Sequence, residues 1–155
     1  MAKANSILAL IEADHQKVEQ LFTESETTKG VKKSQEIFNQ IYKGLTLHAK
    51  AEELVFYPAM REYEETQQYL EEAEQEHNSA KILLEEMKTL NPSDDEFKTK
   101  MQSLKETIRH HVAEEESEIF DAVRECMDDE ELKQLGQEFQ DAKARIEPEI
   151  ELAMA

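Results

Sequence analysis

The chain has 155 residues with only 3 glycines and 3 prolines, and 36 acidic against 18 basic side chains give it a net charge of −18. A chain of this length can bury the core of one compact domain, and its many Glu, Lys, Gln, Ala and Leu residues favour helix, so we predict an all-α protein with a single domain over residues 1–155. The acidic excess disfavours nucleic acid and anionic membrane surfaces as partners, because both are bound through clustered Lys and Arg, and it makes cations the natural partners.

The first predicted helix begins after a cap at Asn5 or Ser6 and ends in the polar segment TESETTKG, where Gly30 is a plausible end signal. The start of the chain, MAKANSILALIEADHQ, has too short an apolar run for a signal peptide or a membrane span. A second helix is predicted over about residues 31–64. Pro58 lies within it and should kink or end it, because proline removes one backbone hydrogen bond.

A third helix is predicted over about residues 65–90, and Ser93 in NPSDDE opens a capping box for a fourth helix over about 94–126. A shorter fifth helix begins near Asp128 and runs through ELKQLGQEFQDAKARI. Four long amphipathic helices with short connections predict an antiparallel up-down-up-down four-helix bundle with a short C-terminal fifth helix. The single cysteine, Cys126, excludes an internal disulfide and fits a reducing compartment, so we expect a cytoplasmic protein.

Each of the four long helices carries a histidine on its apolar face, and these are His15, His48, His77 and His111. In the second and fourth helices an acid follows one turn later, at Glu52 and Glu115. Residues i and i+4 project from the same face of a helix, so each of these two helices can offer an imidazole and a carboxylate to one centre. Buried charges are costly unless they are paired or coordinated to metal, and the pattern therefore predicts a metal site inside the bundle.

The sequence also repeats itself. The segment HAKAEELVFYPAM (48–60) aligns without gaps on HVAEEESEIFDAV (111–123), and IEADHQKVEQLF (11–22) aligns on AEQEHNSAKILL (73–84). The alignment predicts two similar helical hairpins related by a pseudo-twofold, with the histidines facing the shared axis. We expect the core face of the second helix to continue through Val55 and Ala59, and aromatic and aliphatic side chains to wall the pocket, namely Phe56, Tyr57, Ile119 and Phe120.

Neutral imidazole suits iron, zinc and similar ions, and a carboxylate can bridge two of them, so the pattern indicates a dinuclear site. A rival ligand set is also present, because EADH and EQEH place Glu12 and Glu74 three residues before His15 and His77. Such E-x-x-H pairs are typical of ferritin-like di-iron bundles, although they leave the other two histidines of the apolar faces unexplained. Glu53 is expected outside the ligands, as a supporting or solvent-facing acid.

The succession of a histidine, H-x-x-x-E-E with aromatics and proline, a histidine and a second H-x-x-x-E-E resembles the hemerythrin-like (HHE cation-binding) family over about residues 7–143. The resemblance implies a four-helix bundle with two iron ions in an oxo- or hydroxo-bridged non-haem centre. It implies one iron on His15 and His48, the other on His77 and His111, and bridges from Glu52 and Glu115.

The functions that the resemblance implies are binding or sensing of O2, NO or peroxide. The alternative is an iron-handling or peroxide-reducing stress protein of the iron–sulfur cluster repair type. The expected partner is thus a small diatomic ligand or peroxide, and the sequence names no protein partner. Zinc or manganese would fit the same ligands as iron.

One position departs from the family pattern. Hemerythrins that carry O2 have a further histidine one turn before the ligand of the third helix, and this chain has Ala73 there. The missing nitrogen leaves an open or water-filled position, or is replaced by Glu74 or His110. His110 also precedes Glu115 by five residues, a spacing that some family members use, whereas the helical periodicity favours His111.

Overall fold

The computed structural model describes residues 5–154, and all the regular elements in that part of the chain are helical. In chain order these elements are α1 (Ile7–Thr27), α2 (Val31–Ala51), η1 (Glu52–Phe56), α3 (Tyr57–Arg61), α4 (Glu64–Gln67), α5 (Leu70–Lys88), α6 (Asp95–Glu114), η2 (Glu115–Ile119), α7 (Phe120–Cys126) and α8 (Asp129–Met154). None of the described helices combines the length and apolarity needed to cross a membrane.

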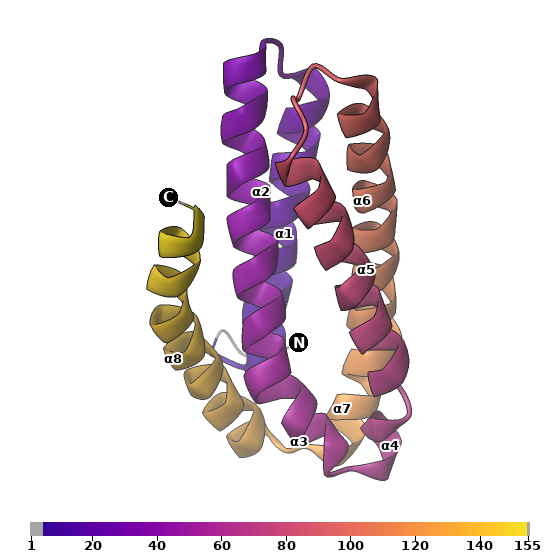
Figure 1. Cartoon of the computed structure of the whole chain (residues 1–155). Helices are drawn as coiled ribbons and strands as arrows, with labels where there is room; N and C mark the ends of the chain where they lie inside the picture. The colour runs from indigo at the N-terminus through magenta and orange to yellow at the C-terminus, as the bar shows by residue number, and fades with distance from the viewer. Residues whose placement is uncertain (1–4, 155) are drawn as a thin grey trace.

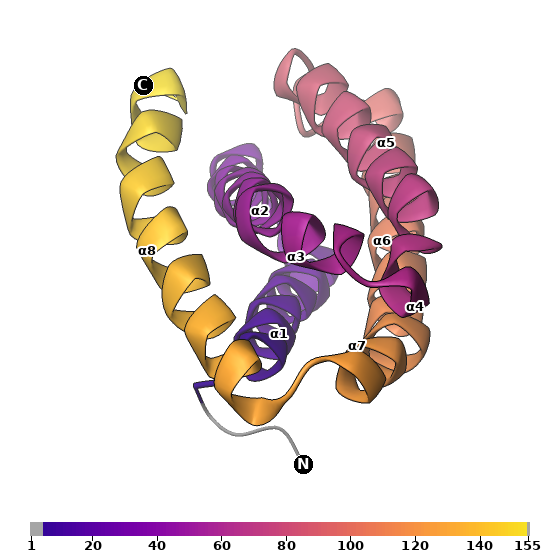
Figure 2. The same ribbon diagram turned by 90° about the horizontal axis from the view of Figure 1, so that it is seen from below.

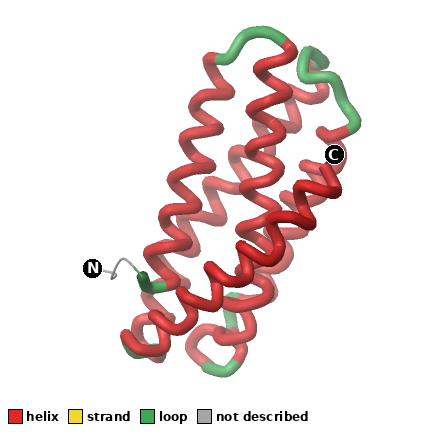
Figure 3. The backbone as a smooth tube through the Cα atoms, turned by 90° about the vertical axis from the view of Figure 1, so that its left-hand side faces the viewer, coloured by secondary structure: helices red, strands yellow, loops and turns green. Residues whose placement is uncertain are grey.

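The helices α1, α2, α5 and α6 form the bundle, and consecutive long helices run in opposite directions (Figure 1). The loops that join them gather at the two ends of the bundle (Figure 3). The last helix, α8, lies outside the bundle against α1 and α2, on the side away from α5 and α6 (Figure 2). The predicted all-α four-helix bundle with a C-terminal fifth helix is therefore confirmed.

A side-chain cap and a glycine mark the starts of the first two helices. The Ser6 hydroxyl accepts a hydrogen bond from the Leu8 N–H at 3.2 Å and caps α1. Gly30 begins α2 instead of ending α1, and its φ of 94° is a conformation that favours glycine. The predicted capping box at Ser93 is wrong, because Asp94 is the N-cap of α6 and the Ser93 hydroxyl donates to Asn91 Oδ1 at 2.7 Å.

The fifth helix is longer than the sequence suggested, with 26 residues ending at Met154. Pro148 lies inside it without ending it. Both Pro148 and Ala144, whose carbonyl loses its intrahelical partner, face solvent, so water can satisfy that carbonyl. Nearer its start, Gly136 packs against the beginning of the chain, where an added Cβ would lie 2.2 Å from the Asn5 carbonyl oxygen.

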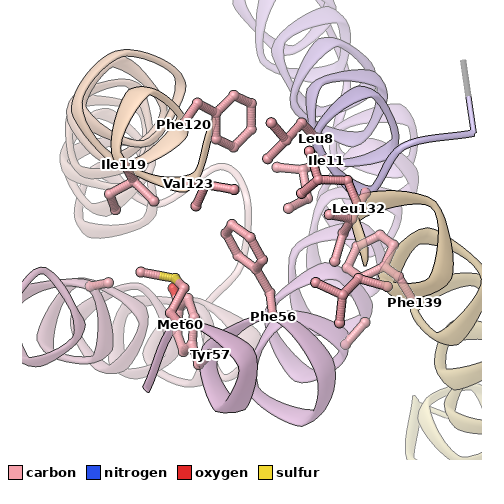
Figure 4. Close-up of a cluster of buried hydrophobic side chains, with 14 of the residues drawn as sticks. Leu8, Ile11, Phe56, Tyr57, Met60, Ile119, Phe120, Val123, Leu132 and Phe139 are labelled. Carbon is pink, nitrogen blue, oxygen red and sulfur yellow. The ribbon is translucent and has the colours of Figure 1, made fainter. Parts of the chain in front are cut away.

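Two apolar clusters fill the molecule, one towards each end. The first joins α1, the η1–α3 and η2–α7 segments and α8, and Figure 4 shows side chains of this cluster converging, among them Phe56, Met60, Phe120 and Phe139. The second joins the opposite halves of the bundle helices, and its members include Val18, Phe22, Phe38, Leu84 and Leu104. The predicted histidine ligands lie along the helices between these two clusters.

Both η elements are π turns inside otherwise continuous helices. The Tyr57 N–H bonds to the Glu52 carbonyl, and the Phe120 N–H bonds to the Glu115 carbonyl, five residues back in each case. Each wide turn inserts one residue and rotates the following helix. Val55 and Ala59, which we predicted on the core face, are therefore only partly buried and pack at the edge of the first cluster.

Phe56 and Met60, one residue further along, are fully buried instead. Pro58 follows the first π turn, and the helix continues past it to Arg61. The second π turn has Asp121 at the equivalent position, so proline is not the cause of these turns.

Candidate metal centre

The six residues predicted as ligands meet in one layer between the two apolar clusters. The helices α1, α2, α5 and α6 each supply one histidine, and the first residue of each π turn supplies a glutamate. Glu52 and Glu115 are both 0% exposed. The ligand atoms form two groups in which all atoms lie within 4.8 Å of one another, and these groups are His15, His48 and Glu115, and Glu52, His77 and His111.

Each buried carboxylate spans both helical hairpins. Glu52 Oε1 lies 3.2 Å from His48 Nε2 and 3.2 Å from His77 Nε2. Glu115 Oε1 lies 3.0 Å from His15 Nε2, and its Oε2 lies 3.7 Å from His111 Nε2. The two histidine pairs also repeat each other, since both have ring centroids 5.0 Å apart and planes at 65°. This is the approximate twofold arrangement that the internal repeat predicted.

A second set of acids holds the histidines from outside. The Nδ1 atom of each histidine bonds to a carboxylate: His15 to Glu116 at 2.6 Å, His48 to Asp14 at 2.8 Å, His77 to Glu53 at 3.0 Å and His111 to Glu76 at 2.7 Å. Because a carboxylate only accepts, Nδ1 carries the hydrogen and Nε2 faces the centre. The outer acids therefore fix both the tautomer and the orientation of the rings.

Three of these outer acids were not singled out in the sequence, although a signal for them was present. Asp14 and Glu76 directly precede a histidine of the centre, and Glu116 directly follows Glu115. The repeat alignment marks these positions, but each acid bonds to a histidine on a different helix, so its partner depends on how the helices pack. Glu53 was expected outside the ligands and lies there, bonded to His77.

Seven buried side-chain atoms of the described residues have no hydrogen-bond partner, and all of them belong to this layer: His15 Nε2, His48 Nε2, His111 Nε2 and both carboxylate oxygens of Glu52 and Glu115. Their distances to one another are short, but their angles are not those of hydrogen bonds. Buried polar atoms are normally satisfied, because leaving them unpaired costs free energy. Coordination to cations would satisfy all seven, so the residues present fit a pair of metal ions.

The pKa values of the metal-free layer show that its carboxylates favour positive charge on the histidines. Burial alone would lower the pKa of His48, but the charge of Glu52 and the hydrogen bond to Asp14 raise it to about 10. Burial likewise opposes protonation of His77, and the nearby Glu52 carboxylate together with the hydrogen bond to Glu53 raises its pKa to about 9. Burial and the charge of Glu52 raise the pKa of Glu115. The carboxylates therefore attract positive charge into the layer.

One side of the centre carries a phenol. The Tyr57 hydroxyl lies 2.9 Å from His77 Nε2, and the tyrosine is 1% exposed. The equivalent residue of the other repeat is Phe120, which has a phenyl ring in place of the phenol. The sequence predicted Tyr57 as a wall of the pocket, and the structure adds a polar contact to a predicted ligand. Ala73, at the position of the missing histidine, is buried in the first apolar cluster, which also contains Tyr57.

The alternative ligands lie outside the two groups. His110 is 63% exposed and pairs with Glu114 at 3.2 Å. The Glu74 side chain pairs with Arg61 at 2.9 Å on the surface. Among the described residues, neither Glu12 nor Glu74 joins a group that could hold a metal. The geometry thus favours His111 over His110 and disfavours the ferritin-like set.

The two flanks of the centre differ. On one flank α8 covers it, with Phe139 packed edge-on to His48 and Lys143 bonded to Asp14 at 2.6 Å. On the other flank a groove of about 440 Å³ lies between α2 and α5 and reaches all four histidines. Small molecules therefore have a route to the centre from the α2–α5 side.

A helical bundle with a buried layer of histidines and carboxylates is the architecture of a cation-binding domain. Residues 6–123 match the family model described as the hemerythrin HHE cation binding domain, and the chain belongs to that family. The fold is also that of a solved hemerythrin HHE cation binding domain-containing protein from Mycobacterium kansasii, with a TM-score of 0.81 at 18% identity over 93% of this chain and 88% of that one.

Two curated relatives are similar along most of this chain. A protein of Nostoc sp. named DNA nickase is 39% identical over 148 residues, which are 94% of this chain and 41% of that protein. This chain therefore spans less than half the length of that relative. An uncharacterized hemerythrin-like protein of Schizosaccharomyces pombe is 24% identical over 143 residues, or 91% of this chain and 70% of the relative.

Proposed function

We propose that this chain holds two iron ions in the histidine–carboxylate layer and binds or senses O2, NO or peroxide there. His15 and His48 would hold one ion, His77 and His111 the other, and Glu52 and Glu115 would bridge them. The observation that carries the proposal is the convergence of seven buried, unpaired nitrogen and oxygen atoms on this one layer. A purely apolar core would not contain such atoms, and a hydrogen-bonded core would provide each of them with a partner.

The donor set supports iron. Each group offers two imidazoles and one carboxylate, a combination that non-haem iron sites use and that leaves coordination positions open. The two buried glutamates and the four outer acids also supply negative charge that offsets the charge of the ions. Bound iron would supply the affinity and the redox chemistry toward a diatomic ligand or peroxide.

The surrounding residues prepare the layer for such a ligand. The groove between α2 and α5 gives small molecules access to the layer. The first apolar cluster, which contains Phe56 and Phe120, excludes water on the adjoining side of the layer. The Tyr57 hydroxyl lies beside His77 Nε2 and is therefore positioned to donate a hydrogen bond to a ligand on that side. Ala73 offers no donor atom, so the position of the family histidine is left free for an exogenous ligand.

Cys126 supports a cytoplasmic location, which is part of this proposal. It is a free cysteine, and its thiol donates to the Ala122 carbonyl at 3.3 Å. Burial raises the pKa of this thiol, which disfavours the reactive thiolate. A half-buried thiol of this kind is suited to a reducing compartment.

Metal analysis of anaerobically purified, iron-loaded protein tests the centre. We expect two irons per chain in the unsubstituted protein and loss of iron in His48→Ala and Glu52→Ala. His110→Ala is the matched control, because it removes the exposed histidine next to His111 and should keep both irons. Full iron content in both ligand variants would falsify the assignment, and zinc or manganese in place of iron would reassign the metal.

A second experiment separates the proposed function from its rivals. Reversible change of the visible spectrum on exposure to air or NO supports binding or sensing, whereas sustained peroxide consumption supports the peroxide-reducing alternative. The name of the Nostoc relative makes a nicking assay on supercoiled DNA worthwhile. The net charge of −18 opposes DNA binding, and we expect no nicking by this chain.

A further inference from the structure

The groove between α2 and α5 is much larger than a diatomic ligand needs. Its volume of about 440 Å³ is more than ten times the roughly 30 Å³ that a water molecule occupies in the liquid. It falls in the range of pockets that hold small organic molecules, which is about 300–1,000 Å³. Along α2 it reaches from Tyr42 past Glu53, a distance of roughly 17 Å at about 1.5 Å per residue.

The wall of the groove is apolar along the part nearer the Tyr42 end, where Leu45, Ala80, Leu84 and Ile108 line it. A hydrogen bond of 2.6 Å from the Tyr42 hydroxyl to Glu85 joins α2 and α5 at this end. An apolar chain bound here would therefore contact these apolar side chains and end near the Tyr42–Glu85 hydrogen bond.

Most charged side chains of the groove are already paired. Glu53 bonds to His77, Glu85 accepts from Tyr42, and Arg61 pairs with Glu74. Lys50 and Lys81 are exposed, and no contact with another described residue satisfies either ammonium group. Two unpaired cations on one opening stand out in so acidic a protein.

The two lysines line the groove from its two walls, Lys50 on α2 and Lys81 on α5. The contacts of residues 42 with 85 and 53 with 77 set the antiparallel register of α2 and α5. This register places Lys50 of α2 and Lys81 of α5 at nearly the same level, close to His48 and His77. A single anionic group at this level would contact both ammonium groups.

We propose that the groove binds an amphipathic monocarboxylate, with its carboxylate between Lys50 and Lys81 and its apolar chain along Leu45, Leu84 and Ile108. The charge complementarity of the lysines selects the anion, and the apolar wall selects the chain. This inference goes beyond the proposed function, because the contacts that hold the ligand do not involve the metal. It places an organic acid beside a centre expected to react with oxygen species.

Calorimetric titration with sodium decanoate tests the proposal on the metal-loaded full chain. Lys50→Ala/Lys81→Ala should weaken decanoate binding about tenfold, or about 1.4 kcal/mol, because it removes both charge contacts. Lys17→Ala/Lys33→Ala removes two exposed lysines that do not line the groove and should leave the affinity unchanged. Decanol, which lacks the charge, should bind both double variants equally. Ala49 lines the groove, so Ala49→Phe should block decanoate binding by filling the groove.

Absence of decanoate binding to the unsubstituted chain, or equal affinity in the two double lysine variants, would overturn the proposal. The His48→Ala protein separates it from the metal assignment. Decanoate binding that persists there and still depends on the lysines supports the groove even where iron is lost. Binding that disappears with the metal and ignores the lysines would show that decanoate coordinates the metal, and would also overturn the proposal.

Discussion

Each of the four histidines in the centre is held between two carboxylates, one at Nδ1 and one near Nε2. The outer carboxylate fixes the ring, and in the proposed metal-loaded centre it would make the ring a better ligand while the inner carboxylate would share the cation. Because the outer acids come from neighbouring helices, every histidine is oriented by a helix other than its own. The quality of the centre therefore depends on how the helices pack as well as on the ligands.

The contribution of an outer acid can be isolated within one π turn. We expect Glu116→Gln to lower metal affinity about 10- to 100-fold, because the amide no longer holds His15 with a charged acceptor. Glu118→Gln changes an exposed acid two residues away and serves as the control. Competition with a metal-binding dye measures both, and equal affinities in the two variants would contradict the orienting role.

The Tyr57 hydroxyl gives a second test at the residue scale. In metal-free protein, Tyr57→Phe should lower the free energy of unfolding by about 1–2 kcal/mol, because a buried nitrogen of His77 loses its partner. Tyr69→Phe removes a hydroxyl that makes no hydrogen bond within residues 5–154 and should have little effect. Urea unfolding of the unsubstituted protein and the two variants measures these free energies. Equal stabilities would mean that the contact between Tyr57 and His77 is not formed in solution.

The convergence of the four histidines with Glu52 and Glu115 could be predicted from the sequence, because the histidines recur on four apolar helix faces in two aligned repeats. His48 and Glu52 lie one turn apart, and that spacing alone brings them to one side of a helix. The partners of Asp14 and Glu76 could not be predicted, because they belong to other helices. Tyr57 was predicted as a buried aromatic residue, but its contact with His77 depends on the π turn before it.

At the scale of the elements, the two π turns are the main difference from a regular bundle. Each begins at a buried glutamate, and each rotates the following segment so that Phe56 and Phe120 enter the core. The helices themselves followed from periodicity and capping. The π turns did not, because their local sequence is compatible with an ordinary α-helix and only the packing on both sides favours the extra residue.

Two glycines provide a matched test of how helices approach one another. Gly136→Ala should destabilise the protein by about 1–3 kcal/mol, because the new methyl group would lie against the Asn5 carbonyl and push α8 from the start of α1. Gly44→Ala meets only Val18 at 3.8 Å and should stabilise α2 by up to about 1 kcal/mol. Opposite shifts of Tm are expected, and a stabilising Gly136→Ala would contradict the close packing of α8.

At the scale of the whole molecule, negative charge is distributed both on the surface and in the centre. The net charge is −18, and the buried layer adds its own carboxylates between the two apolar clusters. Cations that bind in this layer as proposed would replace protons on the histidines. Metal affinity and stability are therefore linked to pH.

The sign of this linkage follows from the raised histidine pKa values, about 10 for His48 and about 9 for His77 against 6.5 for a free side chain. A raised folded-state pKa adds stability that is fully present below the unfolded value and is lost as pH rises through the folded value. We expect the Tm of metal-free protein to fall between pH 6.5 and 9. The gain in Tm on adding metal should grow over the same window, and a constant gain would contradict the exchange of protons for metal.

The separation of the two apolar clusters by a polar layer affects how the molecule unfolds. The layer itself consists of histidines and carboxylates and not of hydrocarbon, so without metal we expect it to contribute little to coupling the two ends. Hydrogen exchange in metal-free protein should then show the ends opening with different free energies, and metal should merge them into one unit. The centre would thus determine the size of the cooperative unit, so that a cell short of metal would hold a chain that opens in parts and is exposed to proteases.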